Sequence, residues 1–296
     1  MRRAVYLLAV VLPICGGVPL AAEPLPGTQP LTFTGDPAAA MVAGLHKYLD
    51  RELAASVEKR KQFWKPDFSS PEAYAKSVQP NRDRLKKILG VVDQRLPPAM
   101  ELVATTDQPA LVAETDRYKV YAVRWPVLPG VDGEGLLLEP TGKVAANVVA
   151  IPDADWTPEM VVGLAPGVPK ESQFARRLTE NGCRVVVPTL IDRKDDFSGN
   201  AKLNKWTNQP HREFVYRMAY EMGRHVIGYE VQKVLAVVDW FCREKTRRPV
   251  MLTGQGEGGL IASFSAAVDT RIDLAKAWDY AGDLSGVWTE PIYRNI

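Results

Sequence analysis

One glycine-rich turn carries the strongest chemical signal in this sequence. It reads Gly254-Gln255-Gly256-Glu257-Gly258-Gly259, between the apolar run 250–253 and a small-residue helical run at 260–268. A strand, a sharp glycine turn and a helix form the context in which a serine nucleophile is presented, in the frame Gly-x-Ser-x-Gly. Here the central residue of the frame is Gly256, which has no side chain. The turn therefore predicts the scaffold of a covalent hydrolytic mechanism without its attacking oxygen.

Glu257 is the residue at this turn that could take over the missing chemistry. A carboxylate at this point could act as a general base and activate water. The alternative is structural, because a negative charge in the first turn of a helix is stabilised by the helix dipole. The backbone at Gly254 and Gly258 belongs to the same turn, and we include both glycines as candidates for the wall of an oxyanion or ligand pocket.

Three further side chains are candidates for a pocket near the turn. Asp153 and Asp155 follow the apolar run 146–151 and could orient a substrate or bind an ion, although acidic residues in such loops also form turns. His225 lies in a helical stretch and could serve as a base, or it could make an ordinary polar contact beside Arg224.

The same glycines also fit a second pattern. Gly254, Gly256 and Gly259 match Gly-x-Gly-x-x-Gly between a strand and a helix, which is a dinucleotide-binding fingerprint. Asp279 lies 25 positions after Gly254, near the end of an expected strand, where an acid could bind a ribose. The fingerprint normally opens such a domain, whereas here it follows two expected parallel strands. We therefore keep nucleotide binding as a minor alternative.

The elements that position these residues follow from hydrophobic periodicity. Asp36 and Ser70 are expected to cap two helices of an N-terminal extension at 36–98. A helix is expected at 171–181, and a longer helical stretch at 211–244 is broken at Gly223 or Gly228. Strands are expected at 100–105, 110–114, 118–125, 134–138, 146–151, 184–187, 250–253 and 274–280.

This order predicts an α/β fold for residues 99–296. The early strands form an antiparallel meander, and the later alternation of strand and helix implies a mostly parallel sheet flanked by helices. Ligands bind beyond the carboxyl ends of the strands in such sheets. Those ends are expected at 152–156, 188–193, the glycine turn and 281–283.

The N-terminus predicts export. Arg2 and Arg3 precede a mostly apolar run at 4–20, and small residues stand before Glu23. This is the pattern of a cleaved signal peptide over 1–22, followed by a flexible leader at 23–35. A membrane anchor is the alternative, but Pro13 and two glycines interrupt the run. We expect a secreted or periplasmic protein with no later membrane span.

Composition excludes several classes of partner. The formal net charge is +2, so no basic field favours nucleic acid. The three histidines and the cysteines have no metal-ligand spacing, and we expect no metal and no cofactor. After signal cleavage Cys183 and Cys242 remain, and two separate buried thiols are expected rather than a disulfide. The oligomeric state is left open.

The order of elements, together with the runs 118–120, 133–140, 211–213 and 223–230, resembles the α/β-hydrolase superfamily. More narrowly, it resembles the exported acetyl-xylan-esterase and dienelactone-hydrolase branch, over about residues 100–296. This implies an elbow serine, a carboxylate and a histidine that act on a small-molecule or carbohydrate ester. It also implies an oxyanion hole formed by the amide of Glu257 and an amide near Asp153–Asp155.

Two departures from that family pattern decide the functional expectation. Gly256 replaces the serine, and no histidine follows it in the sequence. The last strands of the family fold are expected to be missing, as in a truncated C-terminus. We therefore expect an inactive esterase relative, inert or binding an acylated or sugar-like ligand. The alternatives are an active hydrolase that uses Glu257 or another non-serine route, and the nucleotide-binding protein.

Overall fold

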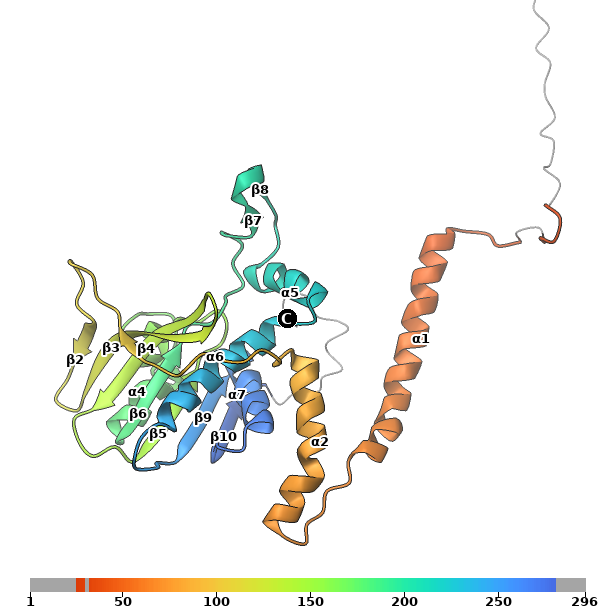
Figure 1. The fold of residues 1–296 in the computed structure, drawn as a ribbon. Coiled ribbons are helices and arrows are strands. Elements are labelled where there is room, and N and C mark those ends of the chain that lie inside the picture. Colours follow the sequence, from red (N-terminus) through yellow and green to blue (C-terminus); the bar gives the residue numbers. More distant parts are fainter. Residues whose placement is uncertain (1–24, 30–31, 281–296) are drawn as a thin grey trace, which may run out of the picture. The chain divides into compact units, whose positions relative to one another are not determined.

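A computed structural model describes residues 25–29 and 32–280 of the chain. The expected signal peptide, part of the leader, the loop expected at 281–283 and the residues up to 296 lie outside the described ranges. The chain divides into two compact units, Met1–Phe63 and Trp64–Ile296 (Figure 1). No helix in the described ranges is long and apolar enough to cross a membrane.

The first unit contains α1 (Pro37–Lys59) and the short helix η1 (Arg60–Phe63). As predicted, Asp36 caps α1, and its carboxylate accepts the amide hydrogens of Ala38 and Ala39. The apolar stripe of α1 is exposed, with Met41 at 69% and Leu45 at 59%. The helix is therefore held by its cap and its own backbone hydrogen bonds rather than by a buried face.

The second unit is built on an eight-stranded sheet in the described part of the chain, in the order β1-β3-β4-β6-β5-β9-β10 with β2 beside β3. The strands β5, β6, β9 and β10 are parallel, and β1 to β4 are antiparallel to their neighbours. This confirms the predicted mixed, mostly parallel sheet with antiparallel N-terminal strands. The bounds are β1 (Glu101–Leu102), β2 (Leu111–Glu114), β3 (Tyr118–Leu128), β4 (Val131–Pro140), β5 (Ala146–Ile151), β6 (Cys183–Pro188), β9 (Val250–Gln255) and β10 (Leu274–Trp278).

Helices cover both faces of this sheet (Figure 1). Val149 and Ile151 of β5 pack in one apolar cluster with α6 and α7, whereas Val148 and Ala150 pack in a second cluster with α3 and α4. A strand buried on both faces needs apolar residues at every position, which explains why β5 lacks alternation. The helices are α2 (Pro71–Leu89), α3 (Pro158–Val162), α4 (Phe174–Glu180), α5 (His211–Glu221), α6 (Val226–Phe241) and α7 (Glu257–Val268), with the short helices η2 (Lys170–Ser172) and η3 (Ala201–Leu203).

The long helical stretch divides at the first of its two predicted break points. Gly223 has φ +65° and separates α5 from α6. Gly228 lies inside α6, where a Cβ atom would stand 1.9 Å from the carbonyl oxygen of Leu89. Gly228 therefore serves the close approach of α2 to α6 and does not break the helix.

Two segments differ in detail from the expectation. The segment between β6 and α5, for which no strand is expected, contains a small hairpin, β7 (Gly199–Asn200) and β8 (Lys205–Trp206). The helix α2, expected in an N-terminal extension, lies in the second unit, and Arg82 Nη1 donates to the carbonyl of Ala267 in α7.

Cys183 and Cys242 are free thiols, as predicted, at the start of β6 and at the C-cap of α6. The prediction that both are buried is wrong: Cys183 is half-buried, and Cys242 is exposed because it follows the last buried turn of α6.

Candidate functional site

The glycine turn lies at the carboxyl edge of the parallel strands, as predicted. β9 is flanked by β5 and β10, with Ile151 opposite Gly254 and Trp278 opposite Gln255. Gly256 joins β9 to α7 with φ +54° and ψ −122°, a conformation that residues with a Cβ rarely adopt. The chain therefore keeps the sharp strand-to-helix bend that a nucleophile would need, with glycine at its apex.

Gly254 and Gly258 let the backbone segments pack closely. A Cβ atom at Gly254 would lie 2.1 Å from the carbonyl oxygen of Gly258, and one at Gly258 would lie 2.3 Å from the carbonyl oxygen of Ile151. Both distances are far below any tolerated contact. These two candidates thus hold α7 against β5 and β9.

The carboxylate of Asp153 occupies the place beside Gly256. Its Oδ2 accepts the amide hydrogen of Glu257 at 2.9 Å, and its Oδ1 accepts the amide hydrogen of Asp155 at 3.2 Å. A Cβ atom at Gly256 would lie 2.1 Å from Asp153 Oδ2. The two regions that the resemblance implies as oxyanion donors therefore both donate to one internal carboxylate, which also fills the space of a side chain at position 256.

Arg193, in the loop after β6, forms ion pairs with three carboxylates at the turn. Its Nη1 lies 3.1 Å from Asp153 Oδ1 and 2.9 Å from Asp155 Oδ2, and its Nη2 lies 3.4 Å from Glu257 Oε2. Burial acts to lower the pKa of Arg193, but the three carboxylates outweigh it and the pKa is raised. The guanidinium group is charged and ties the loop after β5 to the start of α7.

Arg212 continues the network into the core. It is fully buried, and its Nη2 lies 2.5 Å from Glu257 Oε1. Its Nη1 donates to the carbonyl of Ile191 at 3.0 Å and lies 3.5 Å from Oε1 of the buried Glu230. Glu230 accepts the amide hydrogen of Ile191 at 2.8 Å and pairs with Lys233 at 2.6 Å.

Glu257 is held on both sides by this network. Burial raises its pKa, and Arg212 and Arg193 partly offset that effect. One carboxylate oxygen contacts Arg212 and the other contacts Arg193. A general base needs an oxygen that is open to the water it activates, and both oxygens here already bind cations.

His225 has a structural assignment. It is the N-cap of α6 and not a residue within the helix, and its Nδ1 accepts the amide hydrogen of Ile227 at 3.0 Å. Its ring meets Tyr216 edge to face with centroids 5.0 Å apart. Burial, with a contribution from the charge on Arg212, lowers the pKa of His225. The described contacts of His225 thus serve helix α6 and not the turn.

A carboxylate–histidine pair that the sequence did not reveal lies nearby in the chain. His211 Nδ1 lies 2.6 Å from Asp192 Oδ1, and its Nε2 accepts the amide hydrogen of Phe197 at 2.9 Å. The ring also stacks on Phe197. Both ring nitrogens are therefore engaged, and the pair fixes the loop that follows β6.

A polar hollow of about 650 Å³ adjoins this network through Arg193. Amide, carboxylate and guanidinium groups line it, from Arg193, Asp195, Asn208, Gln209, Glu213 and Arg217. The segment between Asp195 and Gln209 also carries Phe197 and Trp206, which are 79% and 61% exposed. The hollow thus offers many hydrogen-bonding groups, and the two exposed aromatic rings lie on the loop between its lining residues Asp195 and Asn208.

Sequence reasoning missed the basic half of the network. Arg212 and Glu230 interrupt buried helical faces, and a charged residue in an apolar stripe is the signal that could have revealed them. Arg193 is the last residue of the stretch 188–193 that follows an expected strand, and ligand-binding side chains gather in such stretches.

The nucleotide pattern finds little support in this geometry. The N-terminus of α7, where a pyrophosphate would lie, faces Asp153 and begins with Glu257. Two carboxylates at that point repel a phosphate. Asp279, the expected ribose-binding acid, instead accepts a hydrogen bond from Gln255 Nε2 at 2.7 Å.

Comparison with known proteins identifies the fold. No protein-family model matches the sequence, and no curated protein is significantly similar to it. A putative acetyl xylan esterase from Bacteroides fragilis NCTC 9343 is 19% identical with a TM-score of 0.52, over 70% of this chain and 53% of that chain. A methylesterase is 13% identical with a TM-score of 0.50, over 76% of this chain and 45% of that chain.

This chain spans about half the length of these two solved structures. The sheet order, the crossovers and the glycine turn at the carboxyl edge agree with the likeness. The chain therefore has the α/β-hydrolase-like fold of the esterases it resembles.

Proposed function

We propose that this chain is an exported, catalytically inactive relative of carbohydrate and acyl esterases that binds a polyhydroxylated, sugar-like ligand. One observation is the main support for the proposed loss of catalysis. At the apex of the turn Gly256 has no side chain, and the carboxylate of Asp153 lies in its place on the amide of Glu257.

The serine mechanism requires a nucleophile, a base and free backbone donors for the oxyanion. Gly256 supplies no nucleophile. The amide of Glu257 already binds Asp153, and that negative charge would repel an oxyanion that forms beside it. Both the attacking group and the stabilisation of its product are therefore absent from this site.

The polar hollow supports the binding part of the proposal. Asn208 and Gln209 each offer donors and an acceptor, and Arg217 and Glu213 add charged groups across the same space. Neighbouring hydroxyl groups of a sugar ring can pair with such side chains, while an exposed ring such as Trp206 offers a flat apolar surface. Its volume of about 650 Å³ falls in the usual range of small-molecule sites.

Export is part of this proposal and rests on the expected signal peptide at 1–22. Expression of the full chain with a C-terminal tag in a Gram-negative host tests it. We expect a periplasmic or secreted product that lacks the first residues by N-terminal sequencing. A full-length product in the cytoplasmic fraction would contradict export.

A chromogenic acetyl-ester assay tests the loss of catalysis. We expect the chain to show no ester hydrolysis that is sensitive to a serine-directed inhibitor. The matched variants are Gly256→Ser and Gly256→Ser with Asp153→Gly, which restore the hydroxyl without and with space for it. Inhibitor-sensitive turnover by the unmodified chain would disprove the proposal.

Calorimetric titration with an acetylated xylo-oligosaccharide tests the ligand. We expect binding that weakens about tenfold in Gln209→Ala and Arg217→Met, since each removes groups from the hollow. Lys202→Met, on η3, is the control and should bind like the unmodified chain. No heat of binding from any oligosaccharide tested would rule out the carbohydrate part.

An active hydrolase that uses Glu257 is the second candidate, because burial raises the pKa of this carboxyl group toward the range of a general acid or base. Glu257→Gln separates the two. Turnover of an acetyl ester that survives serine inhibitors and is lost in Glu257→Gln would favour this route.

A further inference from the structure

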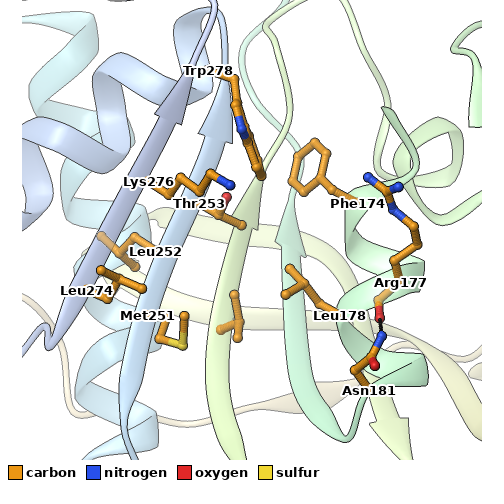
Figure 2. Close-up of a pocket in the computed structure, with 11 residues that line it drawn as sticks. Phe174, Arg177, Leu178, Asn181, Met251, Leu252, Thr253, Leu274, Lys276 and Trp278 are labelled. Carbon is orange, nitrogen blue, oxygen red and sulfur yellow. Dashed lines mark hydrogen bonds between the residues drawn. The ribbon is translucent and has the colours of Figure 1, made fainter. Parts of the chain in front are cut away.

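A second pocket lies on the face of the sheet that α4 covers, away from the glycine turn. It is a groove of about 390 Å³ between α4 and the strands β9 and β10 (Figure 2). Its volume falls within the range of small-molecule sites. The polar hollow shares none of the residues that line it.

The walls of the groove are apolar along most of its length. Val148, Leu178, Met251 and Leu274 line one part of it. Phe174 and Trp278 line the other end, with ring centroids 5.4 Å apart and planes tilted by 55°. An apolar ligand chain in this groove would gain the contacts and the loss of water exposure that drive hydrophobic binding.

Four polar side chains line this groove. Arg177 and Asn181, on the side of α4, donate to the backbone carbonyls of Glu171 and Arg177, and the other two stand together on the strands. Thr253 on β9 and Lys276 on β10 are register partners, and both side chains line the groove. Figure 2 shows them at the same end of the groove as Trp278. The Lys276 Nζ lies 4.5 Å from the centroid of the Trp278 ring.

The described residues satisfy neither polar group fully. Thr253 is only 6% exposed, and its Oγ1 has no hydrogen-bond partner among the described residues. A buried hydroxyl without a partner is costly, so it favours a ligand that supplies an acceptor. Within residues 25–29 and 32–280 no carboxylate forms an ion pair with Lys276, so its charge is open to an anion.

We propose that this groove binds an amphiphilic monocarboxylate. The carboxylate accepts a hydrogen bond from Thr253 Oγ1 and pairs with Lys276 Nζ. The unbranched apolar chain runs along Leu178, Met251 and Leu274. The charge of Lys276 and the orphan hydroxyl determine the head group, and the apolar walls determine the tail.

Titration of the full chain with decanoate at pH 7.5, below its micelle concentration, tests the proposal by calorimetry. We expect saturable binding, with decanol about tenfold weaker because it lacks the charge. Lys276→Met keeps the apolar stem and should weaken decanoate binding about tenfold, and the near-isosteric Thr253→Val should weaken it by about fivefold.

Two controls separate loss of the site from loss of the fold. Lys276→Arg keeps the positive charge and should retain decanoate binding. Lys202→Met removes an exposed lysine on η3 and should not change it. Each variant should melt cooperatively, as judged by circular dichroism. The proposal is overturned if decanoate fails to bind, or if decanol binds as well as decanoate and Lys276→Met has no effect.

Discussion

Asp153 acts at the turn as an anion supplied by the protein itself. Its two carboxylate oxygens accept the amides of Glu257 and Asp155, and Arg193 balances its charge. Backbone amides at the start of a helix attract a negative group, and here a side chain satisfies them. This arrangement requires glycine at position 256, since any side chain there would collide with the carboxylate.

The buried ion pairs of Arg212 give a prediction about the stability of the fold. Arg212→Met leaves the buried carboxylates of Glu257 and Glu230 without this partner. Removing one member of a buried ion pair costs about 3–5 kcal/mol, so we expect a loss of that order in the free energy of unfolding. Urea denaturation at pH 7 measures it.

Arg124→Met is the matched control, because Arg124 pairs with Glu134 at 2.6 Å and the two side chains are 46% and 56% exposed. An exposed pair contributes about 0–1 kcal/mol. Equal losses in the Arg212 and Arg124 variants would show that the buried ion pairs of Arg212 stabilise the fold no more than an exposed pair does.

His225 yields a prediction on pH. Its pKa is lowered in the folded protein, chiefly by burial, so the unfolded chain takes up the proton first as the pH falls. The stability that the neutral ring supplies is therefore complete above the unfolded pKa of about 6.5 and is lost as the pH falls below it. Protonation would also remove the Nδ1 acceptor that caps α6.

His225→Asn keeps a capping acceptor and does not titrate. Relative to this variant, we expect the unmodified chain to lose about 1 kcal/mol of stability between pH 7 and pH 5. Glu257, whose pKa is raised, acts with the opposite sign in both proteins and cancels in the comparison. Parallel pH profiles of the two proteins in urea would refute the assignment.

At the scale of elements, glycines set how closely α7 packs on the sheet. The carbonyl oxygens of Ile151 and Pro152 lie where a Cβ of Gly258 would stand, at 2.3 and 2.4 Å. Backbone atoms cannot move aside as a flexible side chain can, so the helix itself would have to shift.

Gly258→Ala should therefore lower the free energy of unfolding by about 1–3 kcal/mol or more, the usual cost of overpacking. Gly142→Ala is the control, because no atom lies within 4 Å of the position that its Cβ would take and its φ is not in the left-handed range. The control should stay within about 0.5 kcal/mol of the unmodified chain. Thermal unfolding followed by circular dichroism measures both, and a tolerated Gly258→Ala would contradict the packing role.

At the scale of the whole molecule, the chain divides into two compact units after Phe63, whereas the sequence predicts a boundary at residue 98. The sheet and α2 belong to one unit, and α1 belongs to the other. The segment between η1 and α2 has no regular secondary structure and is mostly exposed, and the tryptic sites Arg60 and Lys61 lie just before it in η1.

Limited trypsin digestion tests this division. We expect early cleavage after Arg60 and Lys61 and a product containing the sheet that resists further digestion, because exposed segments are cut before packed elements. Lys65 is not a site, since trypsin does not cut a bond to proline. The thermal midpoint of this product should stay close to that of the larger unit in the full chain. Early cuts within the sheet, before any cut near residue 63, would argue against two units.

The sequence by itself determined the parts of the fold that local patterns encode. The apolar run 146–151 became β5 with the same bounds, Asp36 and Ser70 cap their helices, and the glycine turn lies at the edge of the parallel strands. Such features depend on residues close together in the chain: periodicity selects strand or helix, and capping and glycine decide where each ends. The sequence also shows directly that position 256 is glycine and not serine.

Only the tertiary structure decided what fills the turn. Asp153 and Glu257 are 104 positions apart, and Arg212 lies 45 positions from Glu257, so no local pattern encodes their contacts. The same holds for the groove beside α4, where Thr253 and Lys276 become neighbours through strand pairing. Side-chain partners across a sheet edge depend on how crossovers bring distant strand ends together, and this is a property of the packed chain rather than of any stretch of it.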